Sequence, residues 1–272
     1  MKEKITAFIL TLIATSIMLI FNFPLIWMGL MTFKPTDMIF KEPFRVIFPI
    51  TFEHFGRVNY VVGTTYYMSL IVAISSTLIT LAISIPAAYS ISRFKTGGQN
   101  LLGWLLTLRI TPAIIVLIPM YIMFYNLKLL DTPYALILIY QTFNVPFAVF
   151  VLKSFIDDIP VDYEESALTD GYTQFQVLRK ITLKLSMPAI FTVLILTFVM
   201  AWNEYLFALI LSITKSRTWR VGAQCFAGTS GPGIEFGPLA TSGLLGMIPP
   251  LILAFIVRKH LLRSFTLGII KR

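Results

Sequence analysis

Few residues in this chain have the type and spacing that catalysis or metal binding would need. The two histidines, His54 and His260, fall in segments that we expect on opposite faces of a membrane, so they cannot share a site. No GxxxxGK[ST] phosphate loop occurs, and no spacing typical of metal ligands is present. We therefore expect no catalytic residue, no metal site and no cofactor bound by this chain itself.

Chemistry of another kind is indicated by an acidic cluster that lies between two apolar stretches. Its members are Glu164, Glu165, Ser166, Ala167, Leu168, Thr169, Asp170 and Gly171. Residues 133–152 upstream carry no charge, and residues 185–214 downstream carry one, on Glu204. Acidic side chains suit the start of a helix, and a glycine suits the left-handed turn that ends one. We expect this helix to dock onto a protein outside the membrane; the alternative is a surface loop without a partner.

The elements that position this cluster must lie in a membrane. Of 272 residues, 57% are hydrophobic and 13% are charged, which is more apolar surface than a water-soluble domain of this size can bury. The apolar runs are continuous, which favours helices over the alternating strands of a β-barrel. The sequence predicts an all-α membrane protein with a single domain, residues 1–272. Its six transmembrane helices, of about 20 residues or more each, are predicted at residues 5–31, 66–92, 101–125, 133–152, 186–212 and 237–257.

The distribution of charge predicts the orientation of these helices. The net charge is +9, and most of the 22 Lys and Arg residues fall in segments that are inside if both termini are cytoplasmic. This bias favours a multi-pass protein of the plasma membrane with its N- and C-termini in the cytoplasm. The positive charge then sets topology, with a minor attraction to anionic membrane lipid, and no nucleic-acid partner is expected.

The longest predicted inner loop, residues 153–185, contains two short helices. The first begins near Ile159-Pro160 and ends at Gly171. The second runs from about Thr173 to Leu185, and its apolar residues recur three and four positions apart. The apolar side is formed by Phe175, Leu178, Ile181 and Leu185. That side is expected to lie against the helix bundle or the membrane surface, so the loop is predicted to form an elbow.

The spacing in this elbow resembles the cytoplasmic loop of the permease subunits of ABC importers. Their loop has Glu-Ala-Ala, three residues, Gly, nine residues, Ile, one residue and Leu-Pro. The matching residues here are Glu165-Ser166-Ala167, Gly171, Ile181 and Leu183. The chain departs from the pattern at Ser166, which is still small, and at Lys184, where proline is usual.

The resemblance implies a type I ABC importer permease fold whose cytoplasmic coupling elbow docks on an ATPase. The ATPase-coupling residues would be Glu164, Glu165, Ser166, Ala167, Leu168, Asp170 and Gly171. It also implies a second homologous permease, two ABC ATPase subunits that hold ATP and Mg, and an extracytoplasmic binding protein. The chain would then be a transporter subunit and not an enzyme.

A second similarity concerns the carbohydrate branch of these permeases. The segment 201–209, which contains Trp202-Asn203-Glu204-Tyr205, is similar to the Trp-Asn-Glu-Phe/Tyr segment of the second permease of maltose- and trehalose-type systems, and so is Leu129-Leu130-Asp131-Thr132. This implies import of a di- or oligosaccharide from a sugar-binding protein. Candidates for the translocation path are Gln141, Asn144, Trp202, Asn203, Glu204 and Tyr205.

Other readings of these residues stay open at this point. Polar side chains within a span can instead make helix–helix contacts, and Arg109 can either pair with a carboxylate or extend to the inner interface. The solute could be a polyol, glycerol phosphate or a peptide. A stand-alone secondary transporter would need coupling carboxylates in the spans and internal repeats, and the sequence offers Glu204 alone and no repeat.

Overall fold

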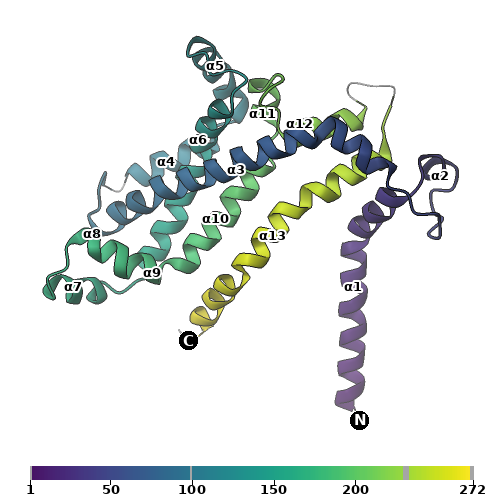
Figure 1. The fold of residues 1–272 in the computed structure, drawn as a ribbon. Coiled ribbons are helices and arrows are strands. Elements are labelled where there is room, and N and C mark those ends of the chain that lie inside the picture. The colour runs from purple at the N-terminus through teal and green to yellow at the C-terminus, as the bar shows by residue number, and fades with distance from the viewer. Residues whose placement is uncertain (1, 99, 229–232, 270–272) are drawn as a thin grey trace. The chain divides into compact units, whose positions relative to one another are not determined.

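The computed structural model describes residues 2–98, 100–228 and 233–269, and the regular structure of these residues is helical. Figure 1 shows the helices in chain order. They are α1 (Lys2–Phe33), α2 (Thr36–Lys41), α3 (Glu53–Arg93), α4 (Asn100–Ile110), α5 (Ala113–Asn126), α6 (Pro133–Asp157), α7 (Asp162–Thr169), α8 (Gln174–Val177), the π-helix η1 (Leu178–Thr182), α9 (Leu183–Leu185), α10 (Met187–Trp202), α11 (Leu206–Leu211), α12 (Trp219–Ala223), the 3₁₀-helix η2 (Gln224–Ala227) and α13 (Phe236–Ile269).

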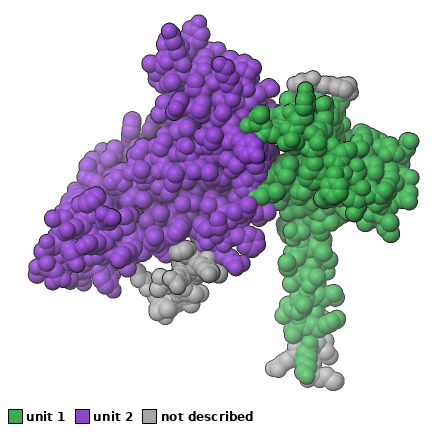
Figure 2. Space-filling model, in the orientation of Figure 1, with its two compact units in different colours: residues 1–64, 222–248 green, residues 65–221, 249–272 purple. Residues whose placement is uncertain are grey.

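The chain divides into two compact units, which Figure 2 shows in different colours. Residues 1–64 and 222–248 form the first unit, and residues 65–221 and 249–272 form the second. Residues of α3 and of α13 fall in both units, and the single transmembrane domain stays a prediction.

The first unit is organised by a buried lysine. The ammonium of Lys34 donates to three backbone carbonyls, those of Glu42, Pro43 and Arg45, at 2.5, 2.9 and 3.0 Å. These bonds satisfy a charge that is completely buried. The segment 34–63, which lies between the first two predicted spans, is partly helical, because α2 lies within it and α3 begins at Glu53 rather than near residue 66.

The second unit has α6 at its centre. Helices α4, α10 and α11 all pack against α6. Ala88 of α3, Ala148 of α6 and Ala189 of α10 belong to one hydrophobic cluster and are completely buried. Small side chains at such positions let membrane helices approach closely, and the resulting packing stabilises the bundle.

Among the described residues, four helices are long and apolar enough to cross a membrane: 6–33, 53–93, 133–157 and 236–258. Two bent helix pairs bring the number to six if each pair counts as one span. The prediction of an all-α membrane protein is confirmed, with four to six candidate spans among the described residues.

The predicted continuous helix over residues 101–125 is wrong in one respect. Helices α4 and α5 meet at an angle of 89°. Pro112 directly precedes α5, where it cannot donate a backbone hydrogen bond and disfavours a helical conformation of Thr111. The chain therefore turns at Thr111-Pro112.

The predicted helix over residues 186–212 is also interrupted. Helix α10 ends at Trp202, and α11 begins at Leu206. The carboxylate of Glu204 accepts the N–H groups of Phe207 and Ala208 at 2.9 and 3.0 Å. A side chain thus takes the place of the backbone carbonyls that would have continued the helix, as at other helix starts.

Candidate functional site

The predicted elbow is present at one end of the second unit, where α7 and α8 lie (Figure 1). Gly171 has φ = +86°, a left-handed conformation that costs other residues free energy and glycine little. The N–H of Tyr172 donates to the carbonyl of Ala167, and this hydrogen bond closes the turn at the end of α7. Thr173 then caps α8 through a reciprocal pair of hydrogen bonds with Gln176. The elbow is therefore defined by local interactions on both sides of the glycine.

The first carboxylate of the cluster, Glu164, is buried inside the chain. Its Oε2 lies 3.1 Å from Nε of Arg93, at the end of α3, and both side chains are about nine-tenths buried. Its Oε1 accepts the hydroxyl proton of Thr182 at 2.9 Å, and Tyr89 donates to Oε2 at 3.3 Å. We call Arg93, Glu164, Tyr89 and Thr182 the Arg93–Glu164 cluster. Both oxygens of Glu164, which was predicted as an ATPase-coupling residue, are thus engaged within the chain, and its part in coupling stays a prediction.

Arg93 also secures the segment that leads into α7. Its Nη2 donates to the carbonyl of Ile159 at 3.0 Å, whereas Nε faces Glu164 without a well-aligned hydrogen bond. The attraction between Arg93 and Glu164 is therefore mainly Coulombic, and burial strengthens it. The end of α3 consequently holds both the entry to α7 and α7 itself.

The opposite face of α7 is free to meet a partner. Glu165, Ser166, Leu168 and Asp170 are exposed, whereas Ala167 is buried against the chain. Exposed aromatic side chains flank this face: Tyr163 precedes it and Phe175 follows the turn, with 58% and 70% of their surface accessible. Tyr163 was not predicted from the sequence as a surface residue. Its position between acidic neighbours was the available signal.

The second helix of the elbow presents a different face from the predicted one. Val177, Thr182 and Ser186 are buried, while Phe175 and Leu185 are exposed. The five-residue π-helix η1 changes the helical register between these positions, so a pattern of three and four residues no longer describes one face. Of the two expected surroundings for this side, the bundle is excluded for Phe175 and Leu185 within this chain, whereas contact with the membrane surface stays a prediction.

Two of the translocation-path candidates have structural roles in the second unit. Gln141 accepts a hydrogen bond from Thr80 at 2.8 Å and donates to Ser76 Oγ at 3.0 Å, which ties α6 to α3. Trp202 is 1% exposed and stacks on Trp219 with ring centroids 5.4 Å apart. Trp202 also stacks on Phe198, so this candidate for the translocation path presents no open ring face within the described chain.

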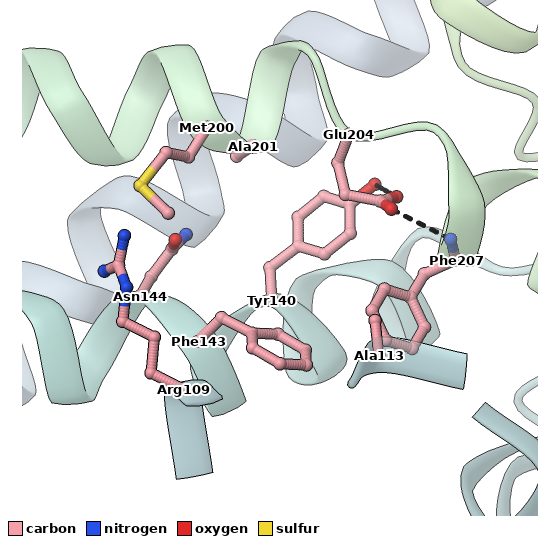
Figure 3. A pocket seen from close by; sticks show the side chains of 9 residues that line it. All are labelled: Arg109, Ala113, Tyr140, Phe143, Asn144, Met200, Ala201, Glu204 and Phe207. Atoms are coloured by element: carbon pink, nitrogen blue, oxygen red, sulfur yellow. Dashed lines mark hydrogen bonds between the residues drawn. The ribbon is translucent and has the colours of Figure 1, made fainter. Parts of the chain in front are cut away.

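The remaining candidates lie around the break between α10 and α11. Asn203 is exposed and donates to the carbonyl of Val199 at 3.0 Å, and Tyr205 is half-buried. Asn144 and Glu204 line a cavity of about 280 Å³ together with Arg109, as Figure 3 shows. The guanidinium of Arg109 lies 4.4 Å from the ring centroid of Phe147, a cation–π contact that neither expectation for Arg109 included.

Asp131, to which the sequence assigned no role, has a structural one. Between α5 and α6 it accepts backbone N–H bonds from Ile213, Thr214, Lys215 and Ser216 at 2.9 to 3.1 Å. Burial alone would raise its pKa, but the N–H groups of Lys215, Ser216 and Thr214 and the Thr214 hydroxyl hold the pKa well below its usual range. Asp131 thus fixes the segment after α11 to the start of α6.

The sequence is similar to transport proteins over its full length. It is 31% identical to the "Trehalose/maltose transport system permease protein MalG" of Thermococcus litoralis, over 100% of this chain and 99% of that protein. It is 32% identical to the "Probable ABC transporter permease protein y4oR" of Sinorhizobium fredii, over 93% and 91%.

The fold is similar to that of a solved transporter subunit. A chain in the crystal structure of a bacterial ABC transporter involved in the import of the acidic polysaccharide alginate matches with a TM-score of 0.77 at 20% identity. The match covers 95% of this chain and 97% of that one.

A family model agrees with the elbow and with the apolar helices. The family described as "Binding-protein-dependent transport system inner membrane component" matches residues 79–267, which include all of α4 to α11. The match covers more than half of the chain, and the relatives extend the similarity beyond it. This multi-pass membrane protein therefore belongs to the family of binding-protein-dependent transport system inner membrane components, the permease subunits of ABC transporters.

Proposed function

We propose that this chain is the permease subunit of an ATP-driven importer for a di- or oligosaccharide. Membership of the permease family and full-length similarity to a trehalose/maltose permease support the sugar branch. In this role the chain forms half of the translocation path and works with a second homologous permease. An extracytoplasmic sugar-binding protein delivers the substrate.

Energy would come from two ABC ATPase subunits that bind ATP and Mg, so the chain itself needs no nucleotide site. The observation that carries this proposal is that the two faces of α7 have different environments. Its inner face is tied to α3 through the Arg93–Glu164 cluster, and its outer face presents Glu165, Leu168 and Asp170. A helix held in this way can receive a push on its exposed face and pass it to the bundle. The elbow then lies in the cytoplasm, together with both termini.

Cysteine crosslinking tests the docking directly. Leu168→Cys, in a Cys225→Ser background, is expected to crosslink to a cysteine scan of the ATPase groove in the assembled transporter, because Leu168 lies on the exposed face. Val177→Cys is the matched control, since Val177 is completely buried and should not crosslink. Absence of any ATPase adduct at Leu168 in an actively transporting complex would contradict the coupling role.

The requirement for ATPases separates this proposal from a stand-alone secondary transporter. Proteoliposomes with all subunits should take up trehalose or maltose when ATP is supplied, and vesicles that lack the ATPases should not. Uptake by the permease pair alone, driven by an ion gradient, would favour the secondary transporter.

A further inference from the structure

The cavity in Figure 3 is lined by residues of α4, α5, α6, α10 and α11 and of the break between α10 and α11, and polar side chains are among them. Its volume of about 280 Å³ is near the lower end of small-molecule sites, which span about 300–1,000 Å³. A site of that size suits a single sugar ring better than a whole oligosaccharide. Phe143 and Phe207, whose ring centroids are 5.4 Å apart, supply an apolar wall.

The carboxylate oxygens of Glu204, which are hydrogen-bond acceptors in this cavity, are already bonded to other groups of the protein. Oε1 of Glu204 accepts the N–H of Phe207 at 2.9 Å, and Oε2 accepts the hydroxyl proton of Tyr140 and the N–H of Ala208, each at 3.0 Å. The single proton of the Tyr140 hydroxyl is thereby committed as well. Glu204 and Tyr140 therefore complete the protein's own structure and leave little capacity for a ligand.

The donors of the cavity, in contrast, are free. Asn144 is 3% exposed, and its Nδ2 has no hydrogen-bond partner. In the described part of the chain, no carboxylate lies within 4.0 Å of Arg109, whose guanidinium contacts the ring of Phe147. A buried donor without a partner is unfavourable, and an acceptor oxygen of a bound ligand would satisfy the Nδ2 of Asn144.

Building on the function proposed above, we propose that this cavity holds one ring of the saccharide during its passage. Asn144 and Arg109 donate hydrogen bonds to hydroxyl oxygens of that ring. Phe143 covers the apolar C–H face of the ring, as aromatic side chains do for flat, partly apolar ligands. Arg109 and Asn144 are then specificity-determining residues of the permease itself, in addition to the binding protein that selects the sugar outside.

The test asks whether substitutions in the cavity and the removal of sugar hydroxyls have non-additive effects on uptake. It uses the complete transporter with its partners in proteoliposomes. Uptake of maltose and trehalose is compared with uptake of their monodeoxy derivatives, for wild type and for Asn144→Leu and Arg109→Lys. Asn144→Leu removes the amide at similar volume, and Arg109→Lys keeps the charge but loses the planar guanidinium. Asn126→Leu, at the exposed end of α5 and outside the cavity, is the matched control.

If Asn144 donates to a particular hydroxyl, removal of that hydroxyl should slow wild-type uptake roughly tenfold and leave Asn144→Leu uptake unchanged, because one hydrogen bond is worth about 1–1.5 kcal/mol. The binding protein is the same in every sample, so its own preference cancels. A non-additive effect on uptake at one deoxy position for Asn144→Leu or Arg109→Lys, with none for Asn126→Leu, supports the proposal.

Three other outcomes overturn it. Suppose that wild type imports the sugars, but that the effect of each substitution simply adds to the effect of removing any hydroxyl. The cavity then does not contact the ring. If the defect of Arg109→Lys is reversed by changing a carboxylate in the second permease, the donors serve the contact between permeases instead. If wild type with all partners imports neither maltose nor trehalose nor any other saccharide, the sugar function itself fails, and the ring site fails with it.

Discussion

Two adjacent carboxylates on α7 have opposite environments. Glu164 is 4% exposed and paired with Arg93, whereas Glu165 faces solvent. Neighbouring positions on a helix point about 100° apart, so one can face the chain while the next faces a partner. The two residues therefore differ in what a substitution should do: changes at Glu164 affect the elbow, and changes at Glu165 affect docking.

The left-handed conformation of Gly171 gives a prediction at this scale. No atom lies within 4 Å of a Cβ placed on Gly171, so a side chain meets backbone strain rather than a steric clash. Gly171→Val should cost about 1–3 kcal/mol in the turn and lower ATP-driven uptake at least about tenfold, with normal amounts in the membrane. Gly171→Asn is the matched control, because asparagine tolerates this conformation, and it should keep most of the uptake. Equal activity of the two variants would contradict the argument.

The hydrogen bonds to Asp131 give a prediction on pH. Its pKa is lowered in the folded protein, so the ionised form stabilises the fold above the unfolded pKa of about 3.9, and this contribution is lost as pH falls through the folded value. At pH 7, Asp131→Asn should reduce the stability by about 1.5–3 kcal/mol, the usual range for hydrogen bonds to a charged group.

Thermal unfolding in detergent between pH 3 and pH 8 measures this effect. The difference between wild type and Asp131→Asn should be constant above about pH 5 and should shrink below the unfolded pKa of about 3.9. Lys128 is the control site, because it also has a positive φ but its side chain accepts no such bonds. The substitution Lys128→Asn should change the unfolding temperature little. A difference that grows toward low pH would contradict the role of Asp131.

At the scale of elements, features set by local sequence were predicted better than contacts between residues far apart in the sequence. The apolar runs located the four long apolar helices, and the spacing from Glu165 to Gly171 located the elbow. The break at Pro112 was not predicted, since Pro146 lies inside α6 without ending it, and neighbouring packing decides between a kink and a break. The partner of Glu164 could not be predicted either, because Arg93 lies 71 residues away in sequence and no local pattern relates them.

The pairing of Arg93 with Glu164 makes the elbow and α3 mechanically continuous. Breaking a buried ion pair typically costs about 3–5 kcal/mol because the remaining charge loses its partner. Arg93→Glu or Glu164→Arg alone should therefore uncouple ATP hydrolysis from sugar uptake. The double variant Arg93→Glu with Glu164→Arg should recover a substantial part of the coupling, and the ratio of sugar imported to ATP hydrolysed measures it.

An exposed pair elsewhere in the chain provides the control for this charge exchange. Arg45 and Glu42 are 2.7 Å apart in the segment after α2, with side chains 52% and 48% exposed. Exposed pairs contribute about 0–1 kcal/mol, so Arg45→Glu with Glu42→Arg should leave coupling near the wild-type value. If exchange at Arg93 and Glu164 recovers nothing while each single variant is correctly inserted, the pair does not transmit force.

At the scale of the molecule, the elbow and the Lys34 region must lie on opposite sides of the membrane for the proposed function. A binding protein acts outside and an ATPase acts inside, so each partner needs its own surface. The bias of Lys and Arg places residues 93–100 and 153–185 in the cytoplasm and residues 34–63 outside. This orientation is a prediction of topology that the helices by themselves leave open.

Site-directed labelling measures the orientation without reference to transport. In a Cys225→Ser background, Arg45→Cys and Thr96→Cys introduce single cysteines at exposed positions in the segments before α3 and after it. A membrane-impermeant maleimide should label Arg45→Cys in intact cells and Thr96→Cys after permeabilisation alone, because an odd number of crossings separates the two sites. Helix α3 supplies that crossing, since it is 41 residues long and apolar enough to span the bilayer once. Labelling of Thr96→Cys in intact cells would place the elbow's side of the bundle outside, where no ATPase could reach it.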